Sequence, residues 1–254
     1  MPSTVERVCA LLVDAHREFR QIEAMPAGAP IATREQAYAI QDCVANAMGG
    51  AGGWKTGAPA PDAEPIAAPL FASWIGPGPA TLPASRFHGI GVEAEFAFRF
   101  ARALPARDRA WSRDEVLAAI EALVPAIEVV DSRLGAWAHG EPLWKLADNQ
   151  SNGYLVYGQP IASWRGIDLA RFPVELWIDG VCVVRGEDSA NPAGDPLRLV
   201  GWLANHLSAT RTGLAAGAIV TTGSYTGLRQ VRPGQRVLAR YPGLGEVEVV
   251  FTPD

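Results

Sequence analysis

The chain has 254 residues, of which 48% are hydrophobic and 19% are charged, a balance that is typical of a packed globular protein and excludes a disordered one. The net charge of -5 provides no positive field for a phosphate backbone, so we expect no nucleic-acid partner. The N-terminal segment carries Glu6, Asp14 and Arg17 where a signal peptide needs an apolar stretch, and no run approaches the ~20 residues of a membrane span. We therefore expect a cytoplasmic protein without a membrane partner.

Capping patterns predict two N-terminal helices. Ser3 and Glu6 open the first, which should run to about Arg20, and residues 33–36 open the second, which should end at residues 49–50, where two glycines suit a left-handed C-terminus. Residues 53–79 are rich in Pro, Ala and Gly and show little periodicity. We predict a long ordered loop there.

The rest of the chain alternates between strands and two helices. Helices are expected from residue 112 to about 123 and from 195 to about 210, and strands at 92–100, 125–130, 153–158, 175–178, 181–184, 218–222, 235–240 and 246–251. This order predicts an α+β protein with one domain over residues 1–254. Its helical N-terminal part would cover residues 1–52, and a mostly antiparallel β body would cover residues 53–254.

The three cysteines, Cys9, Cys43 and Cys182, are odd in number, widely spaced and without a CxxC pair. This pattern predicts reduced core residues and no disulfide framework.

Three glutamates form the first candidate site. Strand alternation places Glu93 and Glu95 together on the face opposite the apolar residues of 92–100, roughly 6.5 to 7 Å apart along the backbone. Such a pair alone is also typical of a solvated strand face. Glu128 argues against a simple solvated face. It lies within an apolar, β-branched stretch, residues 126–130, where burial of a lone charge is energetically very costly.

Two explanations account for Glu128. It could pair with a buried Arg99 or Arg133, or it could share a divalent cation with Glu93 and Glu95. We favour the cation. Oxygen ligands without nearby His or Cys indicate Mg²⁺, Mn²⁺ or Ca²⁺ rather than Zn²⁺, and Mg²⁺ best suits an enzyme whose substrate supplies further oxygens.

Five motifs carry a family resemblance: G-W-K-T-G at 53–57, G-V-E-A-E-F-A-F at 91–98, P-A-I-E-V-V-D-S-R at 125–133, A-D-N-Q-S-N-G at 147–153 and T-T-G-S at 221–224. They resemble the 2-hydroxypentadienoate (2-keto-4-pentenoate) hydratase and 4-oxalocrotonate decarboxylase group of the fumarylacetoacetate hydrolase superfamily. The resemblance implies a mixed β-roll body, homo-oligomers, and Mg²⁺ or Mn²⁺ held by Glu93, Glu95 and Glu128. It also implies a small 2-oxo or 2-hydroxydienoic acid substrate, which would chelate the metal through its C1 carboxylate and C2 oxygen.

The resemblance also implies roles for other residues. Lys55 would be catalytic, as proton donor, base or cation for the substrate carboxylate; only two of the 22 basic residues are lysines, and an amine beside a metal can lose its proton whereas a guanidinium cannot. An exposed surface lysine is the alternative. The implied substrate-binding residues are Gly57, Asp148, Asn149, Ser151, Thr222, Gly223 and Ser224. Ordinary turn chemistry is the alternative for these polar residues.

One stretch departs from the family pattern. Hydratases of this group carry Q-P-D-x-G after the lysine motif, and the corresponding residues 64–70 read E-P-I-A-A-P-L, without the Asp. Glu64, His88 or a metal-bound water are the candidates to replace it. The expected activity is hydration of a 2-hydroxy-2,4-dienoate to a 4-hydroxy-2-oxo acid. The alternatives are a 4-oxalocrotonate-type decarboxylase or acylpyruvate C–C hydrolase on the same metal site, and a non-catalytic protein that binds a small acid.

Overall fold

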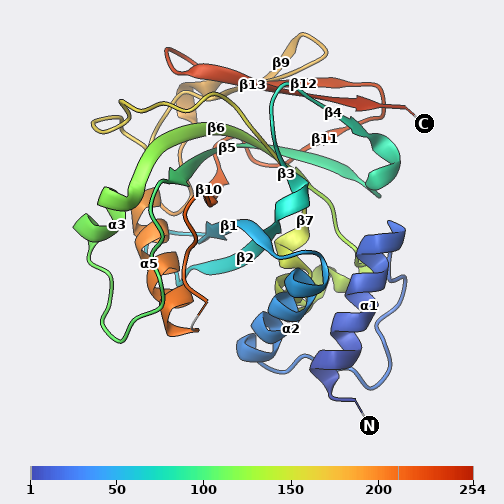
Figure 1. Cartoon of the computed structure of the whole chain (residues 1–254). Coiled ribbons are helices and arrows are strands. Elements are labelled where there is room, and N and C mark those ends of the chain that lie inside the picture. The colour runs from blue at the N-terminus through green and yellow to red at the C-terminus, as the bar shows by residue number, and fades with distance from the viewer. Residues whose placement is uncertain (1, 211, 254) are drawn as a thin grey trace.

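The N-terminal helical pair is confirmed. The computed structural model describes residues 2–210 and 212–253, and in it α1 (Thr4–Glu18) and α2 (Arg34–Ala47) lie side by side (Figure 1). Ser3 forms the predicted capping box with Glu6, and Thr33 caps α2. An additional short helix, α4 (Pro142–Ala147), packs on α2 and contributes the buried Trp144 to the same apolar cluster.

The prediction of three reduced cysteines is wrong for two of them. Cys9 of α1 and Cys43 of α2 form a disulfide, with their Cα atoms 6.0 Å apart. The packing of the two helices brings these residues together, and their separation of 34 positions along the chain gave no indication of it. Cys182 is free and half-buried.

Two sheets form the β body, and most of their strand pairs are antiparallel, as predicted. The larger sheet has the order β2-β1-β10-β5-β6-β7-β3, with β11 also paired to β5, and the smaller has the order β4-β13-β12-β8-β9. The larger sheet contains β1 (Ala51–Gly57), β2 (Ile66–Phe71), β3 (Ile75–Pro77), β5 (Ile90–Phe100), β6 (Ile120–Val130), β7 (Asn152–Tyr157), β10 (Ile219–Ser224) and β11 (Arg229–Val231). The smaller contains β4 (Ala80–Pro83), β8 (Glu175–Ile178), β9 (Val181–Val184), β12 (Arg236–Tyr241) and β13 (Gly245–Thr252).

The sheets pack face to face around the main core. Val92, Phe96 and Phe98 of β5 are fully buried in one apolar cluster with Tyr241 and Val249 of the smaller sheet. The smaller sheet accordingly lies over β5 and β6 in Figure 1. The face of β5 that carries Val92, Phe96 and Phe98 is thus fixed in the core, and the intervening residues point away from it.

The helices of the β body are α3 (Arg113–Ala119) and α5 (Pro196–Ala209). Asp195 caps α5 as predicted, and α5 packs against β1 and β10. The first of these helices is shorter than predicted, because the chain turns into β6 at Ile120.

The predicted loop at residues 53–79 is a further error, because it contains β1, β2 and β3. β1 lies between β2 and β10, so both of its edges pair with other strands. The pairing with β10 joins segments more than 160 residues apart, and local periodicity gives no signal of it. Most of β2 is buried on both faces, and its apolar run does not alternate.

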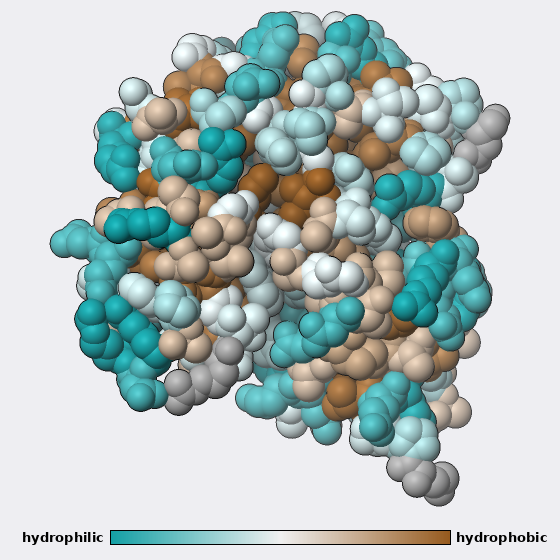
Figure 2. All heavy atoms as spheres, in the orientation of Figure 1, coloured by the Kyte–Doolittle hydropathy of each residue, from teal (hydrophilic) through white to brown (hydrophobic). Residues whose placement is uncertain are grey.

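Hydrophilic side chains are spread around the rim of the face shown in Figure 2, and hydrophobic ones gather toward its middle. None of the helices in the part of the chain that the structure describes is long and apolar enough to cross a membrane. That residues 1–254 form one domain stays a prediction.

Two glycines of β1 give a matched test of this strand arrangement. A Cβ added at Gly53 would lie 2.3 Å from the carbonyl oxygen of Ile219 in β10, whereas one added at Gly57 meets nothing within 4 Å. We predict that Gly53→Ala lowers the free energy of unfolding by about 1 to 3 kcal/mol, because β1 and β10 must separate. Gly57→Ala should stay within about 0.5 kcal/mol of the parent protein. Urea unfolding of both variants tests this, and equal stabilities would contradict the close pairing of β1 with β10.

Candidate metal centre and active site

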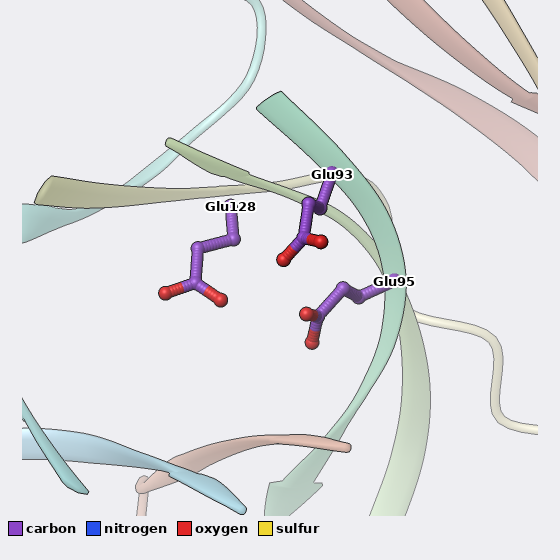
Figure 3. A group of neighbouring side chains, drawn as sticks. All are labelled: Glu93, Glu95 and Glu128. Atoms are coloured by element: carbon purple, nitrogen blue, oxygen red, sulfur yellow. The ribbon is translucent and has the colours of Figure 1, made fainter. Parts of the chain in front are cut away.

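Strand pairing brings the three predicted glutamates together. Glu93 of β5 lies directly opposite Glu128 of β6, so their side chains share one face of the sheet, and Glu95 follows on that face two residues along β5. One carboxylate oxygen from each lies within 4.8 Å of the others. Figure 3 shows the three carboxylates turned toward one another. Glu128 is fully buried, Glu95 is 2% exposed and Glu93 is half-buried.

Fixed donors hold Glu95. Thr221 Oγ1 and the backbone N–H of Gly223, the latter at 3.1 Å, both donate to its Oε2. The hydroxyl of Tyr241 reaches across from the smaller sheet and lies 2.6 Å from the carbonyl oxygen of Glu95 and 2.9 Å from that of Ala126. The second sheet therefore braces the β5–β6 pair at the position of the carboxylates.

Lys55 of β1 pairs with Glu128. Its Nζ donates to Oε1 of Glu128 at 2.5 Å and to the carbonyl oxygen of Gln150 at 3.2 Å, and the Lys55 side chain is 17% exposed. Asn152 Nδ2 donates to the same Oε1 at 2.8 Å. Oε2 of Glu128 is buried and has no hydrogen-bond partner among the described residues.

The alternative in which Glu128 pairs with an arginine is wrong. Arg99 pairs with Glu121 on the surface, and Arg133 pairs with Asp148 at 2.7 Å. Within residues 2–210 and 212–253, neither Glu93 nor Glu95 has an ion-pair partner at bonding distance. The three carboxylates therefore share a single close ammonium.

Burial and this excess of negative charge alter the pKa values of the site. Burial, followed by the charges of Glu128 and Glu93, raises the pKa of Glu95 to about 8. Burial and Glu128 also raise the pKa of Glu93. Burial lowers the pKa of Lys55, but the charges of Glu128, Glu95 and Glu93 outweigh it and leave that pKa above its ordinary value. In the metal-free site Lys55 is thus an ammonium, which fits the roles of proton donor and cation, and its role beside a bound metal stays a prediction.

A pocket with a volume of about 420 Å³ opens beside these groups. Its polar lining consists of Lys55, Thr56, Glu93, Glu95, Gln150, Thr221 and Ser224, and the remaining lining of Gly57, Ala58, Pro59, Ile66, Pro192 and Gly223. Of the seven substrate-binding residues that the resemblance implies, Gly57, Gly223 and Ser224 lie in this lining.

The other four implied residues lie outside this lining. Asp148 is fully buried and accepts hydrogen bonds from the Arg133 side chain and backbone, and Asn149 and Ser151 are buried with it in the turn that follows. Residues 149–151 all have left-handed φ values of 48° to 58°, and this turn directs the Gln150 carbonyl to Lys55. Thr222 points to the opposite face of β10 and donates to the carbonyl oxygen of Phe96.

Three functional contacts were missed from the sequence, namely those of Gln150, Asn152 and Thr221. Strand alternation could have found Thr221, since it shares a face of β10 with Gly223. The other two depend on the turn at 149–151 and gave no sequence signal. Neither suggested protein substitute for the missing Asp lines the pocket, because Glu64 pairs with Arg34 on the surface and His88 pairs with Asp131.

Known proteins share this arrangement of strands and motifs. The family model of the fumarylacetoacetate (FAA) hydrolase C-terminal region matches residues 36–252. The chain belongs to this family. The resemblance based on the five motifs is therefore confirmed.

Named relatives fall within one group of this family. A 2-keto-4-pentenoate hydratase of Paraburkholderia xenovorans is 34% identical over 67% of the chain, and the match spans 62% of that relative's length. A 2-keto-4-pentenoate hydratase of Paraburkholderia phymatum is 30% identical over 98% of the chain and 97% of its own length. The structure of 4-oxalocrotonate decarboxylase from Pseudomonas putida G7, complexed with magnesium and adipate, superposes with a TM-score of 0.83 at 27% identity over 97% of both chains.

The pKa of Glu95 generates a prediction for the metal-free protein. The folded state keeps a proton on Glu95 up to a pH of about 8, whereas the unfolded chain releases it near its ordinary pKa of 4.5. Because the folded state binds more protons in this window, stability should fall as the pH rises from about 4.5 to about 8.

Urea unfolding in the presence of EDTA at several pH values measures this fall. Glu95→Gln is the matched control, since its side chain cannot ionise, and its stability should depend less on pH. If the stability of both proteins depended on pH in the same way, the raised pKa of Glu95 would be contradicted.

Proposed function

We propose that the protein is a divalent-metal-dependent hydratase that adds water to a 2-hydroxy-2,4-dienoate and forms a 4-hydroxy-2-oxo acid. The observation that carries the proposal is the cluster of Glu93, Glu95 and Glu128 with Lys55, of which Glu93, Glu95 and Lys55 line one pocket. The relatives of the chain bear hydratase names. The pocket is of a size that suits a small organic ligand.

The three glutamates would hold the metal. The unpartnered Oε2 of Glu128 and the raised pKa of Glu95 both fit a site that lacks positive charge. Carboxylate oxygens favour Mg²⁺ or Mn²⁺, and the related 4-oxalocrotonate decarboxylase has been solved with magnesium and with calcium. When bound, such an ion supplies Lewis-acid stabilisation of negative charge on the substrate's C2 oxygen.

Lys55 is the proposed proton donor. The reaction requires a proton to leave the 2-hydroxyl group and one to reach C5, after which water adds its oxygen to C4 and a proton to C3. An ammonium has three N–H donors, of which Glu128 and the Gln150 carbonyl accept two. The third is left for a substrate in the pocket that Lys55 lines.

The donors around the carboxylates position the site before a substrate arrives. Thr221 and Gly223 fix Glu95, and Asn152 and Lys55 fix Glu128. Among the described residues that line the pocket, the only side chains suited to act as a base are the glutamates that we propose as metal ligands. We therefore assign activation of the water that adds to the substrate to the metal end of the site. Homo-oligomers and a cytoplasmic location stay predictions.

A substrate panel tests the proposed reaction. Purified protein with Mg²⁺ is incubated with freshly prepared 2-hydroxypenta-2,4-dienoate, 4-oxalocrotonate or fumarylpyruvate, and ultraviolet absorbance and product mass are followed. We predict that the first substrate loses its dienol absorbance and gains one water. Release of carbon dioxide from 4-oxalocrotonate with the dienoate left unchanged would show the alternative decarboxylase activity. A relative with that name, 4-oxalocrotonate decarboxylase of Pseudomonas putida, is 33% identical to the chain over 137 residues.

Two substitutions test the role of Lys55. Lys55→Met should lower kcat by about 10² to 10⁴, because the proton donor is lost. Lys55→Arg keeps the positive charge but not a transferable proton, so it should not restore kcat. An active Lys55→Arg protein would show that Lys55 acts only through its charge.

A further inference from the structure

The pocket changes character along β1. Gly57 lies two residues after Lys55 on the same face of β1, roughly 6.5 to 7 Å away, and Ile66 of β2 lies directly opposite Gly57. Ala58 and Pro59 continue the lining where the chain leaves the strand. The wall therefore passes from charged groups at the glutamate end to an apolar surface at the far end.

The apolar wall is held in place from the other side of the pocket. Pro192 follows Asn191, whose Nδ2 donates to the carbonyl oxygen of Thr222 at 2.8 Å. Ala58 packs in a small buried cluster with Ala193 and Leu199. The two terminal nitrogens of Arg198 in α5 donate to the carbonyl oxygens of residues 60 and 63 in the β1–β2 loop, and its buried Nε has no partner among the described residues.

No free cation faces this wall among the described lining residues. Lys55 is the single basic residue of that lining, and it is bound to Glu128 at the opposite end. The loop of residues 58–65 carries Asp62 and Glu64 and no basic residue. A carboxylate placed against the wall would lose hydration without gaining a partner, which is unfavourable.

We propose that Gly57, Ile66, Pro59 and Pro192 form a subsite for an uncharged hydrocarbon tail, so that the substrate is a monocarboxylic 2-hydroxydienoic or 2-oxo acid. The inference rests on the proposed function, because it assigns the acid end of the ligand to the glutamates. Gly57 controls the space available, since a Cβ added there meets nothing within 4 Å. 4-Oxalocrotonate is a diacid, and its second carboxylate would meet this apolar wall.

Two probes of equal length test the subsite without turnover. 2-Oxohexanoate and 2-oxoadipate differ only in a terminal methyl or carboxylate group, and pyruvate serves as the tail-free reference. Calorimetry with the Mg²⁺-loaded protein should show 2-oxohexanoate binding at least about tenfold more tightly than 2-oxoadipate. Equal or tighter binding of 2-oxoadipate overturns the proposal, as does failure of all three acids to bind.

Matched variants locate the subsite. Ile66→Lys should gain affinity for 2-oxoadipate, and Ile66→Met, of similar length without charge, should not. Gly57→Val should weaken the binding of 2-oxohexanoate and leave the binding of pyruvate unchanged. Thermal unfolding confirms that the variant folds. If these variants change nothing while Lys145→Met alters tail preference, the tail runs toward Lys145, whose charge acts on Glu93, and the assignment of the wall is overturned.

The outcome is distinguishable from that of the proposed function. Tight binding of 2-oxohexanoate without hydration of any dienoate would support the subsite and contradict the hydratase. Hydration of 2-hydroxypenta-2,4-dienoate together with preferred binding of 2-oxoadipate would support the hydratase and contradict the subsite.

Discussion

Three carboxylates that meet on one face of the sheet beside a single close ammonium set the constraint that the rest of the site must satisfy. Hydrogen bonds from Thr221, Gly223 and Asn152 satisfy individual oxygens but add no positive charge. Lys55 neutralises one carboxylate, and burial together with the charges of Glu128 and Glu93 raises the pKa of Glu95. A divalent cation relieves this repulsion, and the same ion is suited to a substrate acid whose C2 oxygen becomes negative during reaction.

The fold supplies the rigidity that such a charge cluster requires. β5 and β6 are each eleven residues long and pair along most of that length, with Glu93 opposite Glu128. The Tyr241 hydroxyl then ties both strands to the smaller sheet. On the other side, the buried Arg133–Asp148 pair holds the left-handed turn that directs Gln150 to Lys55. Asp148 thus serves the site by position, at a distance from the pocket lining.

The parts predictable from sequence are those with a local signal. Alternation in β5 and the apolar setting of Glu128 were sufficient to predict the glutamate cluster, and the capping residues Ser3 and Thr33 were sufficient for α1 and α2. The strands β1 and β2 were missed, since their stability comes from pairing with distant strands and from burial on both faces. The Cys9–Cys43 disulfide and the Lys55–Glu128 pair likewise depend on packing between segments that are remote in sequence.

Titration with Mn²⁺, followed by calorimetry and electron paramagnetic resonance, tests the central claim most directly. The account predicts one bound Mn²⁺ per chain, with affinity lowered more than about 10-fold in Glu128→Gln, since even outer partners of metal ligands contribute that much. Asp62→Asn, which removes an exposed carboxylate of the β1–β2 loop, should bind as the parent protein does. A folded parent protein that binds no Mn²⁺, or a Glu128→Gln variant that binds it equally well, would contradict the account.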